Sequence, residues 1–104
     1  MGFAFLSRWL RGSRPQRADL RVVVYTRHPC PLCDEAWELL DRYRGEYGFV
    51  LEAKNVDESA ELVREYGEWV PVVTVDGKVR FRGHVNEVLL QRILRRSEPE
   101  RPAK

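Results

Sequence analysis

The two cysteines of this 104-residue chain lie in one tetrapeptide, Cys30-Pro31-Leu32-Cys33, at the junction of a strand-like and a helix-like pattern. Before it, residues 22–25 form a mainly β-branched run that is typical of a strand buried on both faces. After it, apolar residues recur at spacings of three and four from position 33 to position 43. Because Pro31 suits a first helical turn, we predict a helix from the tetrapeptide to about Arg44, closed by Gly45.

The next segment predicts a second strand and a short helix. Residues 49–53 are mostly apolar and suggest the strand. Asp57 or Ser59 can cap the helix that follows, and Gly67 is expected as its C′ residue. A strand, a helix and a strand in this order favour parallel pairing with a right-handed crossover.

The last third of the chain predicts a hairpin and a final helix. Pro71 precedes the run at residues 72–75, and Asp76-Gly77 joins that run to residues 78–82, which is a specific two-residue hairpin pattern. After Gly83 we expect a helix whose apolar residues include Val85, Val88, Leu89 and Ile93.

The element order is therefore βαβαββα over residues 21–96. We expect an α/β fold of the thioredoxin-like type, with a four-stranded mixed sheet flanked by three helices. Residues 1–20 are expected to form a basic arm outside the core, flexible or packed on it, and residues 97–104 a flexible tail. The chain is too short for two domains of usual size.

Charge and hydropathy exclude several classes of function. A net charge of +2 is too small to favour nucleic acid as the main partner. The apolar runs are far shorter than a bilayer span, and residues 3–10, interrupted by Ser7 and Arg8, lack the core of a secretory signal. We therefore expect a cytoplasmic protein, and a monomer.

The cysteine pair is poorly suited to a structural role alone. A bridge across so short a loop stabilises a fold by only about 2 kcal/mol on the chain-entropy model. Both cysteines lie at a strand-to-helix junction, which favours redox chemistry.

Residues 22–33, VVVYTRHPCPLC, resemble the glutaredoxin family closely. The resemblance extends to Trp69-Val70-Pro71, to the Asp76-Gly77 hairpin and to Gly83 before the last helix. It implies that Cys30 is the nucleophile and that Cys33 resolves mixed disulfides. It also implies that Pro71 follows a cis peptide bond beside the thiols, where Val70 offers its backbone to the substrate.

The residues themselves support the same assignment of the cysteines. Cys30 is expected at the N-cap of the first helix, where unpaired N–H groups and the helix dipole favour a thiolate. Cys33, one turn further on, is expected to face inward. Cys30 should therefore be the exposed, reactive sulfur.

The resemblance also places substrate-binding residues around the thiols: Arg27, Leu32, Val70, Pro71, Gly83 and His84. Glutathione is a possible reductant, and we expect no tightly bound cofactor. The chain departs from the glutaredoxin pattern at Gly83-His84-Val85-Asn86, which lacks the acid that pairs with the glutathione amine, and at Trp69, where many glutaredoxins have threonine. The expected substrates are therefore protein disulfides or glutathione mixed disulfides, with proteins preferred.

Three alternatives remain open at this stage. The fold could serve as a non-catalytic binding or redox-sensing module. The cysteines with His28 and His84 could hold zinc, or two chains could share an iron–sulfur cluster, although these histidines lack the usual ligand spacing. The apolar and arginine residues of positions 3–11 could form a helix that contacts a membrane, which we consider the weaker expectation.

Overall fold

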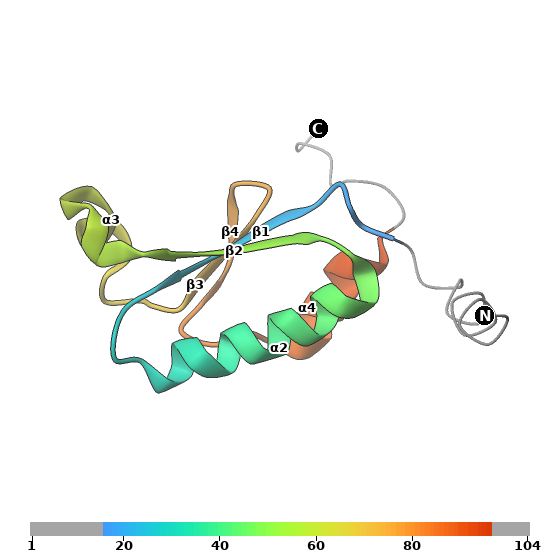
Figure 1. The fold of residues 1–104 in the computed structure, drawn as a ribbon, viewed down its shortest axis with the longest axis horizontal. Helices are drawn as coiled ribbons and strands as arrows, with labels where there is room; N and C mark the ends of the chain where they lie inside the picture. The colour runs from blue at the N-terminus through green and yellow to red at the C-terminus, as the bar shows by residue number, and fades with distance from the viewer. Residues whose placement is uncertain (1–15, 97–104) are drawn as a thin grey trace, which may run out of the picture.

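The computed structural model describes residues 16–96, so the predictions for residues 1–15 and for the tail at 97–104 lie outside the described part of the chain. The order βαβαββα is confirmed, with one 3-10 turn before the second helix (Figure 1). The elements are β1 (Arg21–Thr26), α2 (Pro31–Tyr47), β2 (Val50–Asn55), η2 (Val56–Glu58), α3 (Ala60–Tyr66), β3 (Val72–Val75), β4 (Lys78–Arg82) and α4 (Glu87–Arg95).

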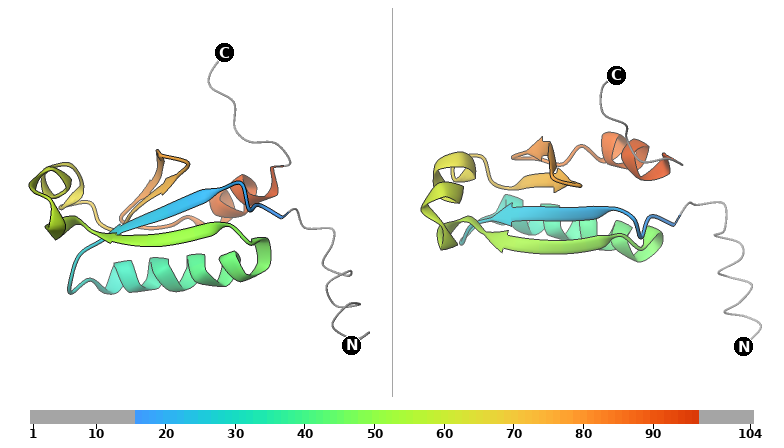
Figure 2. Two further views of the ribbon diagram at one scale, coloured as in Figure 1. Left: turned by 45° about the horizontal axis from the view of Figure 1, so that its top comes forward. Right: turned by 90° about the horizontal axis from the view of Figure 1, so that it is seen from above.

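The four strands form one mixed sheet in the order β2-β1-β3-β4. Strand β1 pairs parallel with β2 and antiparallel with β3, and β3 pairs antiparallel with β4. The sheet lies above α2 in the left view of Figure 2, and both views show α3 beyond one end of the strands. This arrangement is the thioredoxin-like α/β fold expected from the sequence.

The core lies between the sheet and the helix pair α2 and α4. Alternate residues of the central strands face it, because side chains of a strand point to opposite faces in turn. The best-buried members are Val22, Val24, Val73, Leu40 and Leu90, all fully or almost fully enclosed. On the other face of the sheet, the ring of Tyr25 lies 4.8 Å from that of Tyr66, which holds α3 at the end of β1.

Helix α2 ends later than the sequence predicted. It passes through Gly45 and ends at Gly48, whose φ of 77° is left-handed and whose N–H donates to Arg44 O at 2.8 Å. A glycine inside a helix costs only about 1 kcal/mol relative to alanine. Burial of Tyr47, which is 2% exposed, outweighs that cost.

The remaining turns confirm some predicted caps and correct others. Asp76 and Gly77 both have positive φ, as a two-residue hairpin requires. Ser59 caps α3 by accepting from Leu62 N–H at 3.2 Å, so of the two predicted caps Ser59 is the one used. Gly67 directly follows α3, as predicted, but with right-handed backbone angles instead of the left-handed ones common for a glycine after a helix.

Helix α4 faces the core with a different set of residues from the predicted one. It begins at Glu87 after the N-cap Asn86, whose side chain accepts from Leu89 N–H at 3.0 Å. Its buried residues are Leu90 and Leu94. Of the four apolar residues predicted for this helix, Val85 is buried just before it and Ile93 packs against the core, whereas Val88 and Leu89 are exposed.

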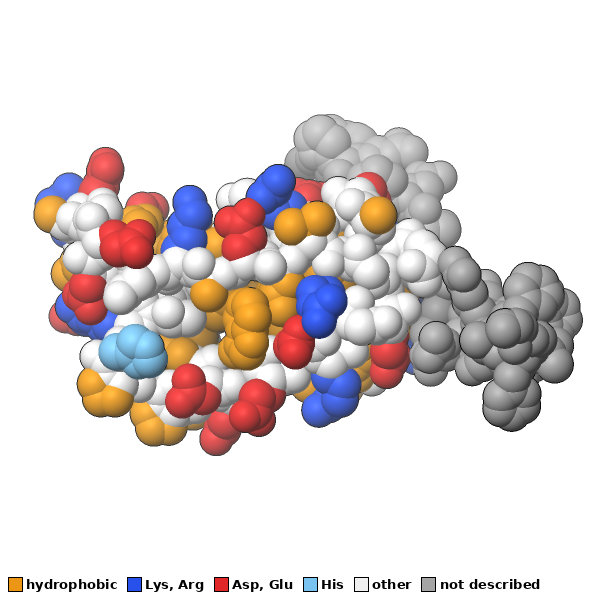
Figure 3. Space-filling model, viewed as in Figure 1, with side chains coloured by type: hydrophobic (Ala, Val, Ile, Leu, Met, Phe, Trp, Pro, Cys, Tyr) orange, Lys and Arg blue, Asp and Glu red, His pale blue; other side chains and the backbone are white. Residues whose placement is uncertain are grey.

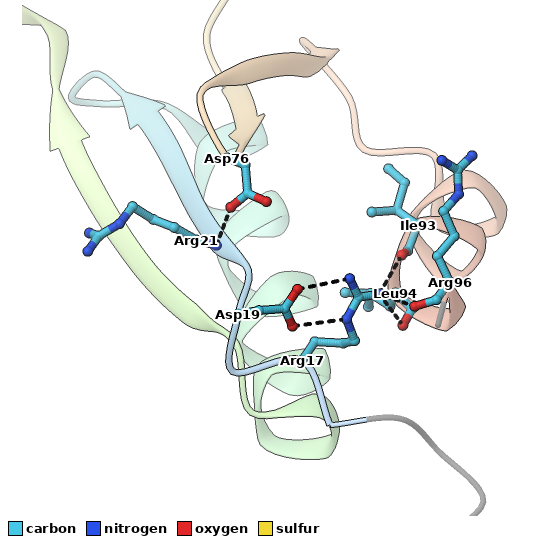
Figure 4. A network of polar contacts seen from close by, with 7 residues as sticks. All are labelled: Arg17, Asp19, Arg21, Asp76, Ile93, Leu94 and Arg96. Carbon is cyan, nitrogen blue, oxygen red and sulfur yellow. Dashed lines mark hydrogen bonds and ion pairs between the residues drawn. The ribbon is translucent and has the colours of Figure 1, made fainter. Parts of the chain in front are cut away.

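Residues 16–20, directly before β1, pack on the core, which is one of the two arrangements expected for the arm, and Leu20 is itself part of the core. Leu20 and Arg17 are each only 4% exposed. Arg17 donates through Nη1 to the carbonyl oxygens of Ile93, Leu94 and Arg96 at the end of α4, and its guanidinium pairs with Asp19 (Figure 4). Hydrogen bonds from Arg17 hold the pKa of the Asp19 carboxyl below its usual value. A buried arginine thus supplies donors to a helix C-terminus.

Candidate active site

Cys30 and Cys33 form a disulfide at the start of α2, with their Cα atoms 5.2 Å apart. Cys30 is the N-cap residue, in extended conformation, and its Sγ accepts from Cys33 N–H at 3.1 Å. Pro31 takes the first helical position, where its missing N–H leaves no bond unmade. The sequence placed both residues correctly, because the cap and the first turn depend on only a few neighbouring residues.

The two sulfurs differ in their access to solvent. Cys33 is 3% exposed and lies on the inward face of α2, as predicted. Cys30 is partly exposed at the end of the loop that leaves β1. An incoming reactant can therefore approach Cys30 and not Cys33.

The Val70-Pro71 peptide bond is cis, as the glutaredoxin resemblance implied, and so is His28-Pro29, which the sequence analysis did not anticipate. Pro71 is buried just before β3. Val72 pairs with Tyr25, so Pro71 lies at the end of β1 from which the thiol loop departs. Gly83 N–H donates to Pro71 O at 2.7 Å, and this bond brings the loop before α4 to the same end of the sheet.

A groove of about 300 Å³ adjoins the tetrapeptide, between the first half of α2 and the loop that precedes α4. It brings together three of the predicted site residues, Leu32, Gly83 and His84. Two carboxylates also line it, Glu35 and Glu87. Neither carboxylate was predicted for this role, although Glu35 stands one helical turn after Leu32 and that spacing could have indicated it.

Arg27 lies at the same end of the molecule but is engaged elsewhere. Its guanidinium pairs with Asp57, at 3.0 Å from Nη2 to Oδ1, and its Nη1 donates to Gly67 O at 3.2 Å. Hydrogen bonding to Asp57 raises the pKa of Arg27 further above its ordinary value. A Cβ atom on Gly67 would lie only 2.5 Å from the backbone Val63 O and 3.1 Å from Nη1 of Arg27, so the close approach of the helix carbonyl favours glycine here. A role for Arg27 in binding a carboxylate stays a prediction.

Within residues 16–96, no three His, Cys, Asp or Glu side chains are grouped so that they could hold a metal ion. Over the same residues no helix has the length and apolar character needed to cross a membrane.

Trp69 is exposed beside the Val70-Pro71 bond, with 56% of its surface open to solvent.

Comparisons with known proteins agree with this geometry. The model of the glutaredoxin-like domain family (DUF836) matches residues 21–95. A probable thioredoxin of Methanothermobacter thermautotrophicus is 33% identical over 67 residues, which cover 62% of this chain and 79% of the relative. The corresponding protein of Methanothermobacter marburgensis is 31% identical over the same shares of both chains.

A solved structure is similar as well. The solution NMR structure of a protein from Nitrosomonas europaea superposes with a TM-score of 0.65 at 28% identity, and covers 72% of this chain and 91% of its own. The same family is indicated by the matching family model, by the fold and by the Cys30–Cys33 disulfide at the start of α2. The chain belongs to the glutaredoxin-like (DUF836) family of the thioredoxin fold, with a thiol–disulfide redox role.

Proposed function

We propose that this protein is a thiol–disulfide oxidoreductase that reduces mixed disulfides of proteins through Cys30 and Cys33. The observation that carries the proposal is the unequal setting of the two sulfurs. Cys30 caps α2 and accepts from Cys33 N–H at 3.1 Å, while Cys33 is 3% exposed behind it. The Cys30 sulfur can therefore react with a substrate, whereas the Cys33 sulfur can react only with Cys30.

The reaction proceeds in two exchanges. The Cys30 thiolate attacks one sulfur of the substrate disulfide, and the other substrate sulfur leaves as a thiolate and takes up a proton. The Cys33 thiolate then attacks Sγ of Cys30, which releases the second substrate thiol and leaves the Cys30–Cys33 disulfide. Two electrons pass to the substrate, and a thiol reductant must return them to the protein.

Two further residues, Val70 and Trp69, are proposed to hold the substrate. The backbone of Val70, next to Pro71, can form β-type hydrogen bonds with an extended chain that carries the target cysteine. Exposed Trp69 offers apolar contact area beside it. Protein substrates are favoured over glutathione because the donors of Arg27 are already paired with Asp57 and Gly67.

A trapping experiment tests the proposal. Cys33→Ser should accumulate a mixed disulfide at Cys30 on incubation with a disulfide substrate, because nothing resolves it. Cys30→Ser is the matched control and should form little or no adduct, since Cys33 is buried. Mass spectrometry measures both yields, and turnover of a protein disulfide by the unmodified chain is measured in parallel.

Two results would overturn the proposal. Equal adduct yields on the two variants would contradict the assigned roles of the cysteines. An unmodified protein that forms the adduct but never turns over would instead be a redox sensor or binding module.

A further inference from the structure

We infer that the groove beside the disulfide selects substrates with a cationic group next to the target sulfur and disfavours anionic disulfides. The inference deepens the proposed function and rests on it. It concerns the class of substrate and not whether the dithiol reacts.

The groove begins at residues that adjoin the disulfide, so a group near the substrate sulfur can reach it. Leu32, inside the redox tetrapeptide, forms part of its wall. Gly83, whose N–H donates a hydrogen bond to Pro71 O at 2.7 Å, forms another part. Its volume of about 300 Å³ is enough for one or two side chains and lies at the lower end of the range for sites of drug-sized ligands. A residue that flanks the substrate cysteine fits this space.

The charged residues that line the groove are acidic. Among its described lining residues Glu35 and Glu87 are carboxylates, and none is lysine or arginine. Glu87 is partly compensated, because Arg42 lies 3.6 Å away and Tyr43 OH donates to it at 2.6 Å. The exposed carboxylate of Glu35 forms no hydrogen bond or ion pair with the side chains and backbone of residues 16–96, so within this part of the chain its charge is not compensated.

The surface around the groove carries the same sign. The sequence from His28 to Asp41 holds no lysine or arginine, and Asp34 and Glu38 are exposed on α2 beside Glu35. Figure 3 shows acidic side chains gathered over the first half of α2, on the side away from the sheet. Glu68, next to Trp69, adds a carboxylate before the Val70-Pro71 bond.

Arg27 and Arg82 lie at the thiol end of the sheet, where Arg27 is paired with Asp57, and a further group of basic side chains lies at the opposite end. The β3–β4 hairpin and the C-terminus of α4 lie there, and a cavity of about 120 Å³ between them is lined by Lys78, Arg80 and Arg96. The net charge of +2 therefore hides two regions of opposite sign. A cation is attracted by the acidic lining of the groove and an anion is repelled from it.

The size of the effect follows from Coulomb's law in water. One carboxylate at roughly 6 Å from a ligand charge changes its binding about threefold, and salt reduces this within a Debye length of about 8 Å. Several carboxylates together should separate cationic from anionic disulfides by about tenfold.

Three small disulfides of different charge test the inference. Cystamine carries two ammonium groups, 2-hydroxyethyl disulfide is neutral, and oxidised glutathione is anionic. The rate at which each oxidises the reduced protein is measured in a single turnover, and each rate is divided by the rate for the neutral disulfide. Glu35→Gln should lower the relative cystamine rate about threefold and raise the relative glutathione rate by a similar factor.

The matched control is Glu46→Gln, the same substitution near the other end of α2. It should leave both relative rates unchanged, whereas 0.5 M salt, taken as roughly three times physiological ionic strength, should reduce the preference of the unmodified protein. Rates that respond to neither Glu35→Gln nor salt would overturn the inference while the proposed function stands. Failure of all three disulfides to react would instead overturn the proposed function.

Discussion

At the scale of single residues, opposing effects act on the Cys30 sulfur. The helix N-terminus favours a thiolate, through the dipole and through Cys33 N–H at 3.1 Å. The carboxylates of Asp34 and Glu35 oppose it, but both are exposed and screened by water. A direct hydrogen bond to a charged group stabilises it by about 1.5–3 kcal/mol, against at most about 1 kcal/mol for each exposed charge. Stabilisation of the Cys30 thiolate by the helix terminus should therefore exceed its repulsion by the two carboxylates.

We accordingly expect the pKa of the Cys30 thiol in the reduced protein to lie well below the ~8.5 of a free cysteine. The pH dependence of the alkylation rate measures it, with Cys33→Ser to confirm that the titrating group is Cys30. A midpoint of the alkylation rate at or above pH ~8 would show that the helix terminus does not lower the pKa of the Cys30 thiol.

At the scale of elements, α4 is joined to α2 by a polar link above the core. Tyr43 OH of α2 donates to Glu87 Oε2 at 2.6 Å and accepts from Gln91 Nε2 at 2.7 Å. Glu87 begins α4, where a carboxylate also meets the positive end of the helix dipole. Because Glu87 and Val85 line the groove, this link positions the wall of the candidate site.

Burial, reinforced by the hydrogen bond to Glu87, raises the pKa of the Tyr43 phenol above its usual value of 10.0. The stability linked to the protonated phenol is fully present below pH ~10 and is lost as pH rises through the raised folded-state value. Tyr43→Phe should lower the free energy of unfolding by about 1–2 kcal/mol at pH 7, because two hydrogen bonds are lost. Above pH ~10 this difference should shrink.

Urea unfolding of both proteins at several pH values measures the difference. Between pH 7 and 9, below the range in which tyrosines ionise, it should stay constant, which serves as the internal control. A difference that is still the same at pH 11, roughly one unit above the reference phenol pKa, would contradict the assigned link.

At the scale of the whole molecule, the residues before β1 tie the ends of the fold together. Arg17 N–H donates to Tyr47 O at 2.7 Å, and its side chain binds the C-terminal carbonyls of α4. Leu20 joins the core between the sheet and the helices. A boundary at residue 21, which strand propensity suggests and the family match shares, would remove these contacts.

We therefore expect a chain that begins at Arg21 to be less stable than one that begins at Gln16, by at least about 3 kcal/mol. Loss of a buried leucine side chain alone costs about 2–5 kcal/mol, and the unpaired helix carbonyls add to it. Urea unfolding midpoints of the two chains measure the difference. Equal unfolding midpoints would show that the contacts of Arg17 and Leu20 do not stabilise the folded chain.

The sequence by itself determined the features that depend on a few adjacent residues. The Cys30 cap, Pro31 at the first helical position and the Asp76-Gly77 turn follow from local backbone chemistry, and all were predicted correctly. The fold class followed as well, because the order of strands and helices leaves few topologies for so short a chain.

Only the tertiary structure decided where burial or long-range pairing outweighs local preference. Helix α2 continues past Gly45 because Tyr47 is buried, and Leu90 rather than Leu89 faces the core because the sheet lies on that side of α4. The partner of Arg27 stands 30 residues away, and the helix end that Arg17 binds is more than 70 away. Contacts between such distant residues exist only once the chain has folded, so no local pattern records them.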